Sequence, residues 1–170
     1  MIKVLFVCHG NICRSPMAEY VMQDLVNKKG LKDRFTIQSA ATSREEIGHD
    51  AHEGTRQKMQ EEGIPIWHRQ ARQMTRQDYE NNDYIILMDE NNWRNAMRII
   101  GSDDEGKVFK AMYFAQTKGG KGIQSGVGVS ESARRSPRDV KDPWYTGNFD
   151  ETYRDIVACC EGLLATVIGK

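Results

Sequence analysis

Residues 4–16 of the chain read VLFVCHGNICRSP, which joins an apolar run, a loop and the start of a helix. The apolar run at residues 4–7 has the composition of a strand that is buried on both faces of a parallel sheet. Ser15 is a good N-cap and Pro16 suits the first helical position, so we expect a helix to begin here. The loop in between therefore presents free backbone N–H groups at a helix N-terminus, an arrangement that binds anions.

The loop also carries side chains suited to reaction at a phosphate group. Cys8 is the candidate nucleophile, because an electropositive loop favours the reactive thiolate form of cysteine. Arg14 offers a planar fork of donors that can hold two phosphate oxygens, and Gly10 is expected to let the loop turn. Cys8 and Arg14 are therefore candidate catalytic residues. The expected phosphate-binding residues are His9, Gly10, Asn11, Ile12, Cys13, Arg14 and Ser15.

The composition of the chain limits its class and its partners. The 170 residues are expected to form one domain with a buried core. Lys plus Arg and Asp plus Glu both number 24, so no overall basic field predicts nucleic acid as a partner. Neither a membrane-spanning run nor a secretory signal is present in the sequence. The four cysteines fit a reducing compartment better than a disulfide scaffold, so we expect a cytoplasmic protein that binds no membrane.

Strand-like and helix-like stretches alternate along the chain. Apolar or alternating runs predict strands at residues 4–7, 35–39, 84–88 and 107–112. Periodicity and stop signals predict helices from residue 15 to Gly30 and over 55–62, 91–100 and 153–167, and Thr75 with Asp78 resembles a capping pair for another short helix. The predicted fold is α/β, a single domain with a doubly wound, four-stranded parallel sheet flanked by helices. Its ligand site is expected beyond the carboxyl ends of the strands, where Cys8 lies.

Residues 119–138 differ from the rest of the chain in composition. They are rich in glycine and serine and end in the run RRSPR at 134–138. Low hydrophobicity and many glycines predict a mobile insertion, or at most a loose hairpin. The arginines at its end are candidates for drawing phosphorylated partners toward the site.

The segment DPWY at residues 142–145 supplies a candidate proton donor. Proline disfavours helix for the residue before it, so Asp142 is expected in a loop that can aim its carboxyl at the site. Such a carboxyl can protonate the oxygen of a leaving group, as a general acid does. An Asp-Pro pair also fits an ordinary turn, so the residues by themselves leave this role open.

Residues 8–16 match the pattern C-x-G-N-x-C-R-S-P and resemble the phosphate loop of the low-molecular-weight protein tyrosine phosphatases. Residues 39–42 (SAAT), 68–73 (HRQARQ), 87–92 (LMDENN) and 142–145 (DPWY) resemble further landmarks of that family, in its order. The resemblance covers most of the chain except residues 119–138. It implies a flavodoxin-like phosphatase fold and hydrolysis of phosphotyrosine, or of small aryl phosphates, through a cysteinyl-phosphate intermediate, with no metal and no cofactor.

The resemblance also implies roles for individual residues. Asp142 corresponds to the family's general acid, and inorganic phosphate or a similar oxyanion is expected in the loop. Asn11, Ser15, Ser39 and His68 are implied to form a hydrogen-bond network that supports the loop. A phosphotyrosine-containing protein is the expected partner.

The expected substrate pocket is formed by Ile12, Glu45, Trp144 and Tyr145. Two aromatic side chains can wall a deep slot that accepts a phenyl ring. The family usually has an aromatic residue at the position of Glu45. An acidic side chain there is expected to repel the phosphotyrosine dianion and the acidic residues that flank it, which weakens affinity or shifts peptide preference.

Two alternative functions are open from the sequence. One is a phosphoarginine phosphatase of the same fold, but relatives with that activity have threonine at the position of Ile12, so Ile12 favours phosphotyrosine. The other is a redox or anion sensor, because peroxide can join Cys8 and Cys13 in a reversible disulfide. The physiological substrate and the oligomeric state do not follow from the sequence.

Overall fold

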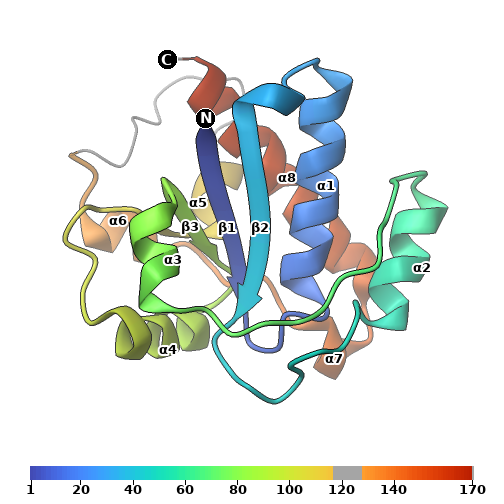
Figure 1. Cartoon of the computed structure of the whole chain (residues 1–170), viewed down its shortest axis with the longest axis horizontal. Helices are drawn as coiled ribbons and strands as arrows, with labels where there is room; N and C mark the ends of the chain where they lie inside the picture. Colours follow the sequence, from blue (N-terminus) through green and yellow to red (C-terminus); the bar gives the residue numbers. More distant parts are fainter. Residues whose placement is uncertain (117–127, 170) are drawn as a thin grey trace.

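The computed structural model describes residues 1–116 and 128–169, and its centre is one parallel sheet (Figure 1). The strands are β1 (Ile2–Cys8), β2 (Phe35–Ala41), β3 (Tyr84–Leu87) and β4 (Val108–Lys110). They lie in the order β2-β1-β3-β4, and every neighbouring pair is parallel. The predicted four-stranded parallel sheet is therefore confirmed. The chain order reverses between β1 and β3, which is where doubly wound folds bind ligands.

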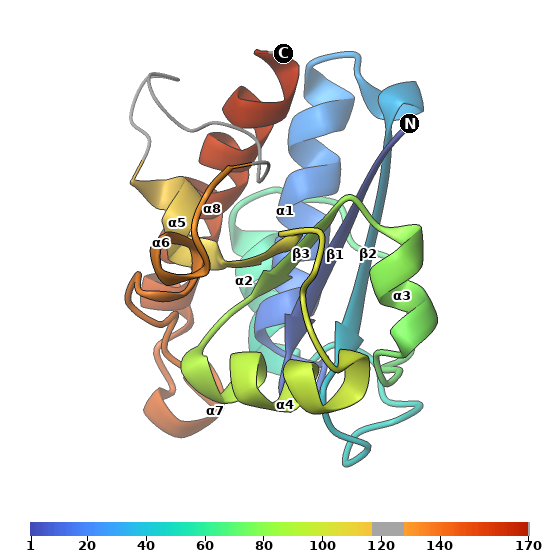
Figure 2. The same cartoon turned by 90° about the vertical axis from the view of Figure 1, so that its left-hand side faces the viewer.

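Helices cover both faces of this sheet. They are α1 (Arg14–Lys28), α2 (Glu53–Glu61), α3 (Arg76–Asn81), α4 (Glu90–Ile100), α5 (Ala111–Ala115), α6 (Glu131–Arg135), α7 (Pro143–Thr146) and α8 (Phe149–Ile168), with a 3-10 turn at Lys32–Arg34. Figure 2 shows α1, α5 and α8 on one side of the sheet and α3 on the other. The single-domain, doubly wound arrangement agrees with the alternation of the sequence.

The core consists of two apolar clusters separated by the sheet. Successive residues of a strand point to opposite faces, so Val4 and Phe6 pack with α1, α5 and α8, whereas Leu5 and Val7 pack with α3 and α4. All four of these side chains have no exposed surface. The run at residues 4–7 is therefore buried on both faces, as its composition predicts.

Several boundaries shift by a few residues from the sequence-based prediction, and two of these shifts have a clear physical cause. Helix α1 begins at Arg14 with Cys13 as its N-cap, because the Ser15 hydroxyl is engaged by Cys8 and Asn11 instead of capping the helix. Strand β4 ends at Lys110, and the predicted strand residues Ala111 and Met112 belong to α5. Both residue types are good helix formers, so the run at 107–112 divides between a strand and a helix.

Of the two caps predicted from the sequence, Ser15 does not cap α1, whereas the pair of Thr75 and Asp78 is confirmed. Thr75 and Asp78 form a reciprocal capping box at the start of α3. Asp89 and Asn92 form a second capping box, which was not predicted, at the start of α4. The stripe of α8 also faces inward, since Ile156, Cys160, Leu164 and Val167 are buried and Tyr153 and Val157 pack against the core.

The segment predicted to be a mobile insertion is described only in part. Residues 119–127 lie outside the described residues, but residues 128–138 contain α6 and pack against β4. Three arginines of this stretch are paired: Arg134 with Asp103, Arg135 with Glu90, and Arg138 with Asp155. This differs from a wholly mobile excursion, because these ion pairs engage the arginines that were expected to draw in partners.

Within residues 1–116 and 128–169, no helix has both the length and the apolar composition needed to cross a membrane.

The buried pair between Arg134 and Asp103 gives the first prediction. Their side chains are only 6% and 4% exposed, and Arg134 also donates to the carbonyl of Val108 at 2.9 Å. Replacing Arg134 by methionine leaves a buried carboxylate without its cation, so the free energy of unfolding should fall by about 3–5 kcal/mol. Urea denaturation followed by circular dichroism measures this loss.

Arg135→Met is the matched control on the same helix. The Arg135 side chain is 39% exposed, so losing its pair with Glu90 should cost about 1 kcal/mol or less. Equal losses in the two variants would contradict a special role for the buried pair.

Candidate active site

The loop from His9 to Cys13 connects β1 to α1 at the carboxyl end of the sheet. Its carbonyl groups are held from outside. The Ile12 carbonyl accepts from the His52 N–H at 2.7 Å, and the Cys13 carbonyl accepts from the Thr55 hydroxyl at 3.0 Å. The His9 carbonyl accepts from Ser43. Because the carbonyls are bonded outward, the backbone amides are left to face the mouth of the loop.

The backbone amides of the loop are available to bind an anion. Among the described residues, the backbone N–H groups of residues 9–13 donate to no protein acceptor. Together with the positive end of the α1 dipole, they form a set of donors for an oxyanion. Arg14 adds another donor, since its buried Nε atom has no partner among the described residues.

Asn11, and not Gly10, adopts the unusual backbone conformation of the loop. Asn11 has a φ of 58°, in the left-handed region that asparagine tolerates better than most residues. Gly10 is not among the described residues with positive φ, so the left-handed conformation of the loop lies at Asn11 and not at the glycine. A Cβ atom at Gly10 would lie 3.3 Å from Cγ of Glu46, so the Glu46 side chain would have to shift by a few tenths of an ångström to accept it.

A chain of hydrogen bonds runs from Arg69 to the sulfur of Cys8. Arg69 Nη2 donates to the Asn11 side-chain oxygen at 2.5 Å, which orients the amide group. The Asn11 amide nitrogen then donates to the Ser15 hydroxyl at 2.8 Å. Ser15 Oγ lies 3.0 Å from Cys8 Sγ and 3.5 Å from the Ala40 carbonyl, so its proton has the sulfur as the nearer of two partners.

The network extends to Ser39 and Glu19 beneath the loop. The same Asn11 nitrogen donates to Ser39 at 2.9 Å, and the Ser39 hydroxyl donates to Glu19 at 2.5 Å. Burial raises the pKa of Glu19, although the hydrogen bond from Ser39 and the nearby Arg69 and Arg72 oppose the shift. The predicted supporting roles of Asn11, Ser15 and Ser39 therefore match the positions of these residues.

His68 lies outside this network. Its side chain is 78% exposed, and Nδ1 lies 2.9 Å from the Asp50 carboxylate. Arg69, one residue later, reaches Asn11 instead, so the inferred role of His68 in bracing the loop is wrong. The two side chains point in different directions along an extended segment, and Arg69 has the longer reach.

Arg14 is buried between two carboxylates. Its Nη1 atom donates to Asp89 at 2.7 Å and to the Val140 carbonyl at 2.8 Å, and Nη2 lies 3.4 Å from Asp142. Burial by itself would lower the pKa of Arg14, but Cys8, Asp89 and Asp142 outweigh it and raise the pKa above its ordinary value. Arg14 is therefore a permanent cation at the base of the site.

Cys13 is chemically different from Cys8, although both line the same cavity. Burial, reinforced by Cys8 and Asp142, raises the pKa of Cys13 to about 12. Cys13 is therefore a neutral thiol at ordinary pH. All four cysteines of the chain are free.

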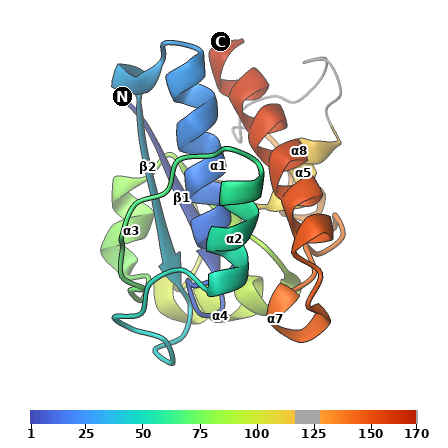
Figure 3. The same ribbon diagram turned by 90° about the vertical axis from the view of Figure 1, so that its right-hand side faces the viewer.

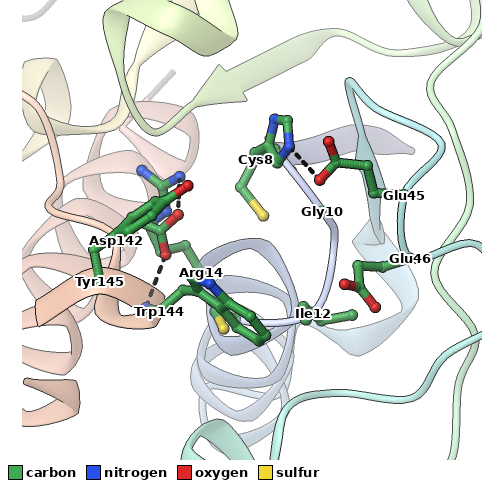
Figure 4. A pocket seen from close by; sticks show the side chains of 11 residues that line it. Cys8, Gly10, Ile12, Arg14, Glu45, Glu46, Asp142, Trp144 and Tyr145 are labelled. Atoms are coloured by element: carbon green, nitrogen blue, oxygen red, sulfur yellow. Dashed lines mark hydrogen bonds and ion pairs between the residues drawn. The ribbon is translucent and has the colours of Figure 1, made fainter. Parts of the chain in front are cut away.

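A cavity of about 110 Å³ opens above the loop and collects most of the predicted site residues (Figure 4). Its lining residues are Cys8, His9, Gly10, Ile12, Cys13, Arg14, Glu45, Glu46, Asp142, Trp144 and Tyr145. Asp142 caps α7 by accepting from the Trp144 N–H at 3.0 Å, and the carboxylate faces Arg14. The loop and the DPWY segment therefore meet at one cavity.

The two walls of the cavity differ in chemistry. Trp144 and Tyr145 lie on one side, and Glu45 and Glu46 lie on the other (Figure 4). The Glu45 carboxylate lies 2.9 Å from His9, and Glu46 lies 2.5 Å from His49. An oxyanion at the base would therefore enter between an aromatic wall and an acidic wall.

Several residues of the site were not predicted. Arg69 and Asp89 lie in residues 68–73 and 87–92, two segments that resemble the family, but no role was assigned to them. Glu19 and Glu46 were not considered. A possible signal was the buried charge of Arg14, which requires an acidic partner. The spacing of residues in the sequence does not reveal which carboxylate pairs with Arg14.

The fold and the loop together define an α/β protein with a cysteine-containing oxyanion loop at the point where the strand order reverses. Residues 3–125 match the family described as low molecular weight phosphotyrosine protein phosphatase. The chain is 41% identical over 167 residues to the low molecular weight protein-tyrosine-phosphatase YfkJ of Bacillus subtilis, a match that covers 98% of this chain and 96% of that protein. The chain belongs to the low-molecular-weight protein tyrosine phosphatase family.

Other relatives agree with this assignment. The low molecular weight phosphotyrosine protein phosphatase of Homo sapiens is 36% identical, over 95% of this chain and 93% of that protein. The crystal structure of YfkJ matches with a TM-score of 0.85 at 37% identity, covering 99% of this chain and 96% of that chain. The structure of a Drosophila arginine phosphatase matches with a TM-score of 0.76 at 26% identity, covering 96% of each chain.

Arg69 and His68 give a prediction about the support of the loop. Arg69→Met removes the charged donor that orients Asn11, so affinity for inorganic phosphate should fall about 10- to 100-fold. His68→Ala removes an exposed side chain and should leave that affinity within about twofold. Isothermal titration with phosphate measures both. The reverse ranking would return the bracing role to His68.

Proposed function

We propose that this protein hydrolyses phosphotyrosine in proteins, and small aryl phosphates, without a metal ion and through a cysteinyl-phosphate intermediate. The observation that carries this proposal is the surroundings of Cys8. Its sulfur lies 3.0 Å from the Ser15 hydroxyl, in a cavity that Arg14 and Asp142 also line. Nucleophile, anion site and acid are thus within one small volume.

In the first step, Cys8 Sγ attacks phosphorus and the bond to the phenolic oxygen breaks. The loop amides and Arg14 hold the three equatorial oxygens of the transition state. Asp142 gives its proton to the departing oxygen. The phosphate also competes with Asp142 for Arg14, which frees the Asp142 carboxyl for the leaving oxygen.

In the second step, water attacks the phosphorus of the thiophosphate and the sulfur departs. Asp142 accepts the proton of that water, and inorganic phosphate is released. The Ser15 hydroxyl donates to the departing sulfur and stabilises its charge. Asn11 keeps Ser15 in the orientation that this requires.

Tyrosine is the preferred residue in this proposal. Ile12, Trp144 and Tyr145 offer apolar surface to a phenyl ring. Similarity to a Drosophila arginine phosphatase keeps phosphoarginine as the second candidate, but Ile12 stands where threonine was expected for that activity. The acidic wall of Glu45 and Glu46 is the feature that favours a cationic substrate.

The cellular setting and the redox role are also part of the proposal. Cys8 and Cys13 are both free, which suits a reducing compartment such as the cytoplasm. Peroxide would oxidise Cys8 to a sulfenic acid, and attack by Cys13 would then form a disulfide and release water. This protective disulfide stays a prediction.

Substitutions at Cys8 and Asp142 test the chemistry. Cys8→Ser should abolish turnover of a phosphotyrosine peptide, and Asp142→Ala should lower kcat about 10²–10⁴-fold because general acid–base catalysis is lost. Stopped assays in the presence of a chelator, with phosphotyrosine, phosphoserine and phosphoarginine peptides, measure both effects. Metal dependence, or preference for phosphoarginine, would overturn the proposal.

The acidic wall predicts a preference among phosphotyrosine peptides. A peptide with lysine beside phosphotyrosine should show a kcat/KM about fivefold above that of a peptide with glutamate there, because Glu45 attracts the cation. Glu45→Gln should reduce this ratio, and added salt should do the same. Glu80→Gln, on the exposed surface of α3, is the control and should leave the ratio unchanged. No difference between the peptides would contradict the role of Glu45.

A further inference from the structure

His52 joins three parts of the protein at one end of the molecule. Its backbone N–H donates to the carbonyl of Ile12 at 2.7 Å, which holds the phosphate loop. Its ring Nδ1 accepts from the Gly54 N–H at 3.0 Å, which caps helix α2. Figure 3 shows that the beginning of α2 and α7 lie at this same end.

The ring of His52 also contacts the aromatic side chains that follow Asp142. It stacks on Phe149 with centroids 5.4 Å apart and an interplanar angle of 17°. It meets the Trp144 ring at 5.6 Å and 78°, in an edge-on arrangement. Both geometries are favourable for aromatic pairs.

This junction tolerates little change in shape. A Cβ atom at Gly54 would lie 2.3 Å from Cζ of Phe149, so a side chain at position 54 would displace the ring. Glycine at position 54 therefore lets Phe149 lie against the start of α2, where His52 covers it. The packing of the three rings depends on this close approach.

Trp144 transmits this contact to the proposed acid. Trp144 is 57% exposed. Among the described residues, the aromatic ring that contacts Trp144 is that of His52. The backbone N–H of Trp144 donates to Asp142 Oδ1 at 3.0 Å. The Asp142 carboxyl thus lies between the Trp144 N–H and Arg14, and Trp144 contributes to its orientation.

We propose that His52 is a positioning residue that holds Trp144, and through it Asp142, over the phosphate loop. The proposal rests on the proposed function, in which Asp142 protonates the leaving group. The His52 ring does not touch the reacting atoms. It links the loop that carries the nucleophile with the segment that carries the acid.

Two substitutions separate the ring of His52 from its capping atom. His52→Asn keeps a cap for α2 but removes the ring, whereas His52→Phe keeps a ring but removes the cap. If the ring positions the acid, His52→Asn should impair protonation of the leaving group while retaining stability. His52→Phe should retain protonation while lowering the unfolding temperature by about 2–4 °C.

The dependence of the rate on the leaving group tests the proposal, because a residue with only a structural role would not change it. Phosphotyrosine needs protonation of its leaving oxygen, while p-nitrophenyl phosphate needs it less because p-nitrophenol is more acidic. In His52→Asn, the ratio of kcat/KM for phosphotyrosine to that for p-nitrophenyl phosphate should fall about 3- to 10-fold. In His52→Phe, this ratio should stay within about twofold of that of the wild type.

Ser130→Ala is the control for destabilisation alone. It removes the cap of α6, where Ser130 accepts from the Ala133 N–H at 3.1 Å, and should leave the ratio unchanged. If the wild type hydrolyses both substrates but His52→Asn keeps the wild-type ratio, the role of His52 is overturned and the proposed function stands. If the wild type hydrolyses neither substrate, both are overturned.

Discussion

The side chain of Asn11 is the interaction on which the rest of the site depends. Its backbone is left-handed, with a φ of 58°, and its side chain is fully buried. One amide group joins the phosphate loop to Ser39 of β2 and to the extended segment that carries Arg69 and Arg72. A strained conformation persists only where its surroundings over-determine it, and these contacts supply that constraint. These contacts hold the loop at Asn11, while the bonds from His52 and Thr55 hold its last two carbonyls.

A second constraint is the charge of Arg14. A guanidinium that is 1% exposed needs negative partners, and it has them in Asp89 and Asp142 on opposite segments of the chain. Asp89 also caps α4 by accepting from the Asn92 N–H at 2.7 Å, so its position is fixed by a helix. Asp142 is held by the weaker 3.4 Å contact with Arg14. When an oxyanion binds, the geometry favours displacement of Asp142, and not of Asp89, from Arg14.

Much of the fold follows from local sequence signals, whereas the details of the site do not. The buried run at residues 4–7 and the capping pair of Thr75 and Asp78 are short-range patterns, and the structure confirms both. The choice between His68 and Arg69 depends on side-chain reach across the molecule, which spacing does not encode. The family resemblance also misled there, because it assigned the role to His68, the histidine of the segment HRQARQ. Likewise, the composition of residues 128–138 is that of a linker, but composition does not reveal that Arg134 has a buried partner in Asp103.

The location of Cys8 on β1 has a consequence for the stability of the site. Cys8 is the last residue of the strand at the centre of the sheet, between β2 and β3, and residues 4–7 before it have no exposed surface. Backbone amides in such a strand exchange with solvent only when most of the molecule opens. The sulfur and the fold therefore belong to the same cooperative unit. Opening of β1, which would displace Cys8, thus accompanies global unfolding.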